Sequence, residues 1–63
     1  MTASEAWSIM VTADQRRFRA YASRNRDERA RKAYERAVED SLVAHVQFNK
    51  ALADANFTAN LAA

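Results

Sequence analysis

An apolar repeat at helical spacing runs through residues 25–55, about half of the chain. Its members recur at intervals of three and four, which places their side chains on one face of an α-helix. The chain contains no Gly and no Pro, and the Ala, Arg, Glu, Lys and Leu of this stretch are strong helix formers. The pattern therefore predicts a long amphipathic helix. The repeat comprises Ala30, Tyr34, Ala37, Val38, Ser41, His45, Phe48, Leu52 and Ala55.

A second helix is predicted upstream. Thr2 and Glu5 have the spacing of a capping box, in which each side chain satisfies the other residue's backbone amide. Thr12 to Gln15 repeats this pattern, so a break at Thr12 stays open as an alternative. The apolar stripe of this first helix contains Trp7, Val11, Asp14, Phe18 and Tyr21, with Met10 and Ala22 beside it. Its acidic member, Asp14, is the wrong kind of residue for a core.

The two apolar stripes predict a turn between the helices. Carried straight through residues 23–28, one helix would place the stripes roughly 160° apart, on opposite sides. A turn lets them meet, and Asn25, three residues before Glu28, is the predicted N-cap of the second helix. Asp27–Arg31 and Glu28–Lys32 are predicted ion pairs along this helix. One long bent helix with an N-terminal arm remains the alternative, because no Gly or Pro marks the turn.

The predicted fold is therefore an all-α helical hairpin of two unequal amphipathic helices in a single small domain over residues 1–63. The first helix covers about 3–23, the turn about 23–27 and the second helix about 26–56. Residues 57–63 are predicted to form a C-terminal tail that frays or becomes ordered on a partner, because Asn56 and Asn60 are poor helix residues.

The core of such a hairpin is expected to be too small for an isolated chain. Apolar residues make up 49% of the chain, and 15 of them are alanines. A chain of 63 residues buries only about 60% of the surface that it exposes when unfolded. We therefore expect a homo-oligomer or packing on a larger protein assembly. The predicted interface comprises Trp7, Val11, Phe18, Tyr21, Tyr34, Val38, Leu42, His45, Phe48, Leu52, Phe57 and Leu61.

Basic residues concentrate around the predicted turn. Residues 16–36 hold nine of the ten basic residues and three acids, a net charge of +6, and the rest of the chain has a net charge of −4. This basic pole makes a small nucleic-acid-binding regulator the alternative function. The predicted phosphate-binding residues are Arg16, Arg17, Arg19, Arg24 and Arg26. Phe18 and Tyr21 lie among them, and core packing is favoured over base stacking for both side chains.

The sequence carries no catalytic signature. Asp40, Ser41 and His45 spell a Ser–His–Asp set, but a helix interior lacks both a strained nucleophile turn and free amides for an oxyanion. A single His with scattered carboxylates does not provide clustered zinc ligands. We therefore expect no enzyme activity, no metal and no cofactor, and read Ser41 and His45 as polar members of an apolar seam that fix its register.

The longest apolar run is three residues, and the first ten residues contain Glu5 and no Lys or Arg. Neither a membrane span nor a classical secretion signal is expected, and Ala-dominated faces make membrane binding unlikely. The predicted location is cytoplasmic or virion-associated. The favoured function is a non-enzymatic helical assembly or adaptor protein that acts by protein–protein binding, of the kind found as viral or mobile-element accessory or structural components.

Overall fold

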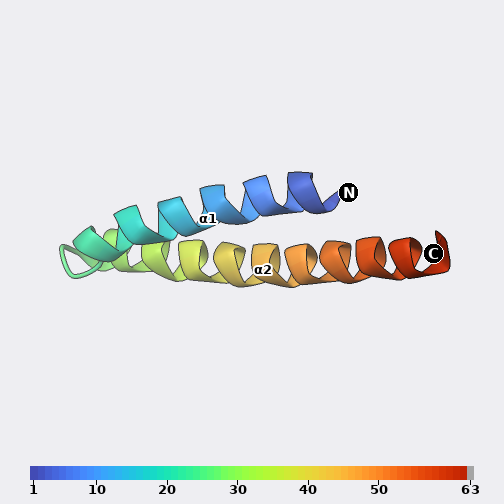
Figure 1. Cartoon of the computed structure of the whole chain (residues 1–63). Coiled ribbons are helices and arrows are strands. Elements are labelled where there is room, and N and C mark those ends of the chain that lie inside the picture. Colours follow the sequence, from blue (N-terminus) through green and yellow to red (C-terminus); the bar gives the residue numbers. More distant parts are fainter. Residues whose placement is uncertain (63) are drawn as a thin grey trace.

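The computed structural model describes the backbone of residues 1–62 and the side chains of residues 1–57. Two α-helices, α1 (Ala3–Ser23) and α2 (Glu28–Ala62), are joined by a turn over residues 24–27. The helices lie antiparallel and side by side in a rod of 54 × 13 × 13 Å, as Figure 1 shows. The predicted all-α class and helical hairpin are confirmed. The alternative of one long bent helix is wrong.

α1 is continuous through Thr12. At its start, the Thr2 hydroxyl accepts a hydrogen bond from the Glu5 amide at 3.1 Å and donates one to the Glu5 carboxylate at 3.1 Å. This confirms Thr2 as the N-cap, although the Glu5 carboxylate is bonded to the Thr2 hydroxyl rather than to the Thr2 amide that a capping box would use. The Thr12 hydroxyl donates to the carbonyl oxygen of Ser8 at 3.0 Å, a bond made inside a helix. Thr12 therefore does not begin a new helix, and no separate N-terminal arm forms.

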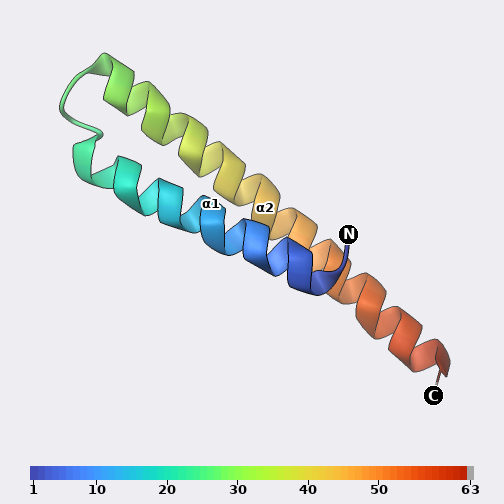
Figure 2. The same ribbon diagram turned by 90° about the horizontal axis from the view of Figure 1, so that it is seen from above.

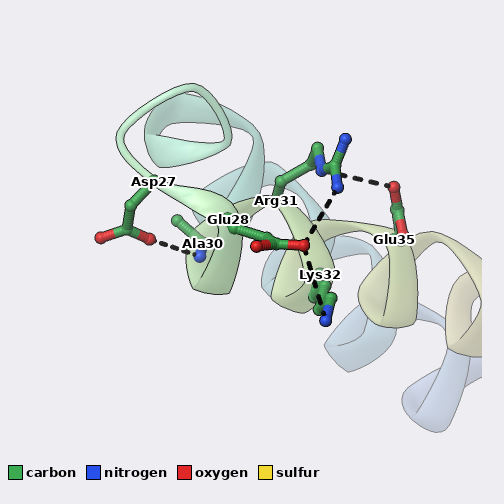
Figure 3. A network of polar contacts seen from close by, with 6 residues as sticks. All are labelled: Asp27, Glu28, Ala30, Arg31, Lys32 and Glu35. Atoms are coloured by element: carbon green, nitrogen blue, oxygen red, sulfur yellow. Dashed lines mark hydrogen bonds and ion pairs between the residues drawn. The ribbon is translucent and has the colours of Figure 1, made fainter.

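The turn ends α1 and begins α2 without a left-handed residue. The Arg24 amide donates to the Tyr21 carbonyl at 3.4 Å, and the Arg26 amide donates to the Ser23 carbonyl at 3.0 Å. No residue that the structure describes has a positive φ, so the turn does not require Gly. Because residues 24–26 are used to reverse the chain, the N-cap of α2 is Asp27. Its carboxylate accepts a hydrogen bond from the amide of Ala30 at 2.8 Å (Figure 3).

The predicted cap at Asn25 is therefore wrong, and α2 begins at Glu28 rather than near residue 26. Its C-terminal end also differs from the sequence prediction. α2 continues to Ala62, so residues 57–62 are helical rather than a separate tail. Each Asn costs the helix less than about 0.7 kcal/mol relative to Ala, which is too little to end a helix that contains neither Gly nor Pro. Residue 63 lies outside the described residues.

Small side chains form the seam between the helices. Among the described side chains, the buried apolar residues are all alanines, and four of them lie seven residues apart along α2. Seven residues are close to two helical turns, so these methyl groups follow one line along the helix. Ser41 is the fully buried polar residue of the same seam. We call this line the alanine seam; it comprises Ala6, Ala13, Ala30, Ala37, Ser41, Ala44 and Ala51.

The large apolar side chains lie mostly outside this seam. Trp7 is 54% exposed, Leu42 is 58% exposed and Phe18 is 76% exposed. The prediction that Phe18 packs in a core formed by its own chain is therefore wrong. The physical reason is the position of Phe18 on the helix: it lies about 140° around α1 from the buried Ala13, so its ring falls outside the contact with α2.

α2 is longer than α1 and extends past its first turn. Met1 lies near Gln47, Lys50, Ala51 and Asp54 of α2, so the N-terminal end of the chain lies at about this level of α2. Figure 2, like Figure 1, shows the remaining C-terminal turns of α2 beyond the N-terminus of the chain. We call residues 55–62 the overhang.

Candidate functional site

The hairpin has two unlike sides, one on each flank of the alanine seam. On the first side, α1 contributes the residues that share a helix face with Asp14, and α2 contributes the residues that share a helix face with His45. Members of each row are three or four residues apart. Contacts between Asp14 and His45 and between Tyr21 and Tyr34 bring the two rows together. We call this side the apolar face; it comprises Trp7, Val11, Phe18, Tyr21, Tyr34, Val38, Leu42 and Leu52.

A polar cluster lies in the middle of the apolar face. The Ser41 hydroxyl donates a hydrogen bond to Asp14 Oδ1 at 2.6 Å. His45 Nε2 lies 3.1 Å from both carboxylate oxygens of Asp14. The hydrogen bonds from Ser41 and then His45 lower the pKa of Asp14 below its ordinary value of 3.8. The acid that looked misplaced on an apolar stripe is therefore held as a carboxylate by two residues of the facing helix.

This arrangement differs from the Ser–His–Asp set that the sequence spells. Asp40 lies on the opposite side of the hairpin, where it lines a groove with Arg16. Ser41 and His45 both make their hydrogen bonds with Asp14. Because the Ser41 proton is directed to a carboxylate and the hydroxyl is fully buried, this oxygen is not presented to a substrate as a nucleophile. The geometry makes the cluster a link between α1 and α2.

Aromatic rings close the apolar face near the turn. The rings of Tyr21 and Tyr34 meet edge to face, with centroids 5.7 Å apart. The Arg24 guanidinium covers the Tyr21 ring, with its central carbon 3.6 Å from the ring centroid, and donates to the Tyr21 carbonyl at 2.7 Å. A cation at the carboxyl end of α1 interacts favourably with the helix dipole. Arg24 therefore serves as a C-terminal cap, and its charge is engaged within the chain.

The other side of the hairpin carries an open groove of about 490 Å³. Charged and hydroxyl-bearing side chains alternate there with two apolar ones, Ile9 and Val43. We call this side the groove face; it comprises Ser8, Ile9, Thr12, Arg16, Glu39, Asp40, Val43 and Gln47. The mixed composition distinguishes it from the apolar face, where large apolar side chains flank the polar cluster on both sides.

The structure places most of the predicted interface residues on or beside the apolar face. Tyr34, Val38, Val11 and Phe48 are half-buried at the edges of the seam, and His45 belongs to the polar cluster. Phe57 is exposed on the overhang. The side chain of Leu61 lies outside the described residues. Their role as an interface stays a prediction.

The five predicted phosphate-binding arginines have different surroundings. Arg24 contacts Tyr21, and Arg26 lies 3.7 Å from the carboxylate of Asp27. Arg16 lines the groove face. Arg17 is displaced from Arg16 by about 100° around α1 and lies close enough to Asp14 to lower its pKa slightly. Arg19 is exposed on α1.

Ion pairs stabilise the first turns of α2. Glu28 lies 3.7 Å from Lys32 and 3.6 Å from Arg31, and Arg31 also lies 4.0 Å from Glu35 (Figure 3). The predicted Glu28–Lys32 pair is thus present. The predicted Asp27–Arg31 pair is not among these contacts, because the Asp27 carboxylate caps the helix. All of these side chains are well exposed, so each pair contributes at most about 0.5 kcal/mol.

Within the residues that the structure describes, no three His, Cys, Asp or Glu side chains lie close enough together to hold a metal ion. Over the same part of the chain, neither helix has a segment with the length and hydrophobicity of a membrane span. No protein-family model, curated protein or solved structure matches this chain.

Proposed function

We propose that this chain is a non-enzymatic binding protein, a small helical assembly or adaptor component whose apolar face docks on protein. One observation carries the proposal: alanine methyl groups fill the seam, whereas Trp7, Phe18 and Leu42 remain exposed. Large apolar side chains gathered on one face of a small protein are characteristic of a surface that is covered by a partner.

The energetic contrast between seam and face supports the proposal. A buried methyl group contributes about 0.8 kcal/mol, so the six buried alanines provide about 5 kcal/mol toward closing the hairpin. Full burial of a Phe or Leu side chain contributes about 1.5–3 kcal/mol. Each exposed large side chain of the apolar face can add a substantial part of that amount when a partner covers it. Docking therefore buries the large apolar side chains that remain exposed when the hairpin forms.

The polar cluster is compatible with a covered face. A bare carboxylate is costly to remove from water, but Asp14 already accepts a hydrogen bond from Ser41 and contacts His45. Its polar neighbours come from α2 of the same chain, so they remain in place when a partner covers the face. The cluster also restricts which partners fit, because a partner must leave these hydrogen bonds intact.

Site-specific photocrosslinking in cells that express the chain tests this function. A benzophenone side chain replaces Leu42 on the apolar face in one variant and Gln47 on the groove face in the matched control. Both positions are exposed on α2. The position-42 probe is expected to give a discrete protein adduct and the position-47 probe a much weaker one. Equal crosslinking at both positions, or no protein adduct at position 42, would contradict the proposal.

The alternative, a nucleic-acid-binding regulator, keeps one observation in its favour. The residues 16–36 have a net charge of +6, and Arg16 and Arg19 form no ion pair within the described part of the chain. Phosphate contacts of this kind weaken steeply as salt rises, because each releases condensed counterions. The salt dependence of binding therefore separates this alternative from protein docking.

A further inference from the structure

The exposed area of the chain is large for its mass. The chain exposes 5146 Å², whereas a compact monomer of 7.1 kDa exposes about 4,100 Å². The surplus of about 1,000 Å² is similar to the area of about 800 Å² that each partner contributes to a typical stable interface. Pairing with one more hairpin along its length would therefore bring the chain to the exposure expected of a compact protein.

The layout of the apolar face is suited to pairing with itself. The Asp14–Ser41 contact lies near the middle of the length over which α1 and α2 are paired. Large apolar side chains flank it in both directions along the rod: Trp7 and Leu52 on one side, Phe18, Tyr21 and Tyr34 on the other. A two-fold axis through the cluster places each flank on the opposite flank of a second copy, as an isologous interface requires.

Charge selects the relative direction of the two copies. The turn half of the rod includes the residues 16–36 with net charge +6, and the remainder of the chain has net charge −4. Parallel pairing would place two strongly positive turns side by side. Antiparallel pairing separates the turns and places each one beside the net-negative part of the other copy, which is the electrostatically complementary arrangement.

We infer that the apolar face binds a second copy of this chain, in an antiparallel, two-fold symmetric pair with the two Asp14–Ser41–His45 clusters at its centre. This inference rests on the proposed protein-binding function and identifies the partner. The pair is a four-helix arrangement in which each hairpin supplies two helices. The apolar side chains supply the hydrophobic free energy, and the central polar clusters fix the register, because a shifted pair would set them against apolar side chains.

Sedimentation equilibrium tests the pairing. The wild-type chain is expected to have twice its monomer mass of 7.1 kDa at micromolar concentration. The variant F18Q/L42Q removes two large side chains from the apolar face and is expected to weaken association at least 100-fold. The matched control I9Q/V43Q changes two side chains of the groove face that are 45% and 52% exposed, and it should associate like the wild type.

Because Phe18 and Leu42 are already exposed in the single hairpin, circular dichroism should show that the face variant keeps its helices at the concentrations at which it is monomeric. Loss of association in the groove variant alone would place the interface on the groove face and overturn the inference. A wild type that stays monomeric to millimolar concentration would also overturn it. In that case, a position-42 photocrosslink to another protein would show that the proposed docking function survives.

Distance measurement tests the direction. The chain has no Cys, so N25C provides a unique spin-label site in the turn. Residue 25 lies beyond the end of α1, and the helix from residue 14 to residue 23 is about 14 Å long, so antiparallel pairing places the two labels at least about 27 Å apart. Parallel pairing places them within about 20 Å, two helix diameters. Dilution with unlabelled chain should abolish the signal, and a short distance that disappears on dilution would refute the antiparallel pair.

Discussion

Replacement of Ala44 by Leu tests whether the alanine seam sets the spacing of the helices. Ala44 is buried against α1, and Ala13 of α1 lines the same groove wall. Leu adds three carbon atoms at a place where backbones approach closely, so the helices must separate or the side chain must adopt a strained rotamer. Overpacking of this kind costs about 1–3 kcal/mol. Helix propensity contributes little, because Ala and Leu are both strong helix formers.

For a domain of this size, 1 kcal/mol corresponds to about 4–8 °C in Tm. A loss of about 2 kcal/mol, the middle of the range for overpacking, therefore predicts that Ala44→Leu lowers Tm by about 8–16 °C. Circular dichroism at fixed chain concentration measures this change. The control is Ala53→Leu, at an exposed position nearer the C-terminal end of the same helix. It should change stability by less than about 0.5 kcal/mol. Equal or higher stability of Ala44→Leu would refute the seam as the determinant of helix packing.

Three further predictions concern the cluster, the turn and the arginines. Because the pKa of Asp14 is lowered in the folded chain, its contribution to stability is complete above its ordinary pKa of 3.8 and is lost as the pH falls through the lowered pKa. Asp14→Asn should therefore reduce the loss of stability at low pH, measured by urea unfolding between pH 2 and 6. An unchanged dependence of stability on pH would count against the cluster. Asp27→Ala should lower the free energy of unfolding by about 1 kcal/mol, because it removes the N-cap of α2, whereas Asn25→Ala should lower it by less than about 0.5 kcal/mol. If thermal unfolding gave the reverse order, Asn25 would be the cap. If Arg16, Arg17 and Arg19 contact duplex phosphates, changing all three to Gln reduces by about three units the slope of the logarithm of the binding constant against the logarithm of the salt concentration. The protein-docking proposal instead expects that both the wild type and this variant have little affinity for nucleic acid at physiological salt.

The hairpin itself follows from features that are local in sequence. The two apolar stripes are out of phase across residues 23–28, and a turn is the arrangement that lets both face the same partner. The N-cap at Thr2 depends on residues three apart, so it is also readable from the sequence. The cap at Asp27 was less accessible, because Asn25 and Asp27 are both good caps and the choice depends on how many residues the reversal uses.

Which residues of the predicted apolar stripe are buried in the alanine seam, and which lie on the exposed apolar face, depends on the distance between the helices. Tyr34 and Ala37 lie close together on the apolar arc of α2, and either could face α1 by periodicity alone. The recurrence of Ala at every seventh residue from Ala30 to Ala51 was the available signal that the small side chains form the contact. The partners of Asp14 were not predictable, because they depend on the register of α1 against α2.

Trp7, the single tryptophan of the chain, lies on the apolar face and can report directly whether association covers that face. Its fluorescence emission and its quenching by acrylamide report whether water reaches this face. If the apolar face is the binding surface, a rise in chain concentration through the range where the mass doubles should shift the emission to the blue and reduce the quenching constant severalfold. Unchanged emission and quenching while the mass doubles would show that the chain associates through another surface and that the apolar face is not the binding surface.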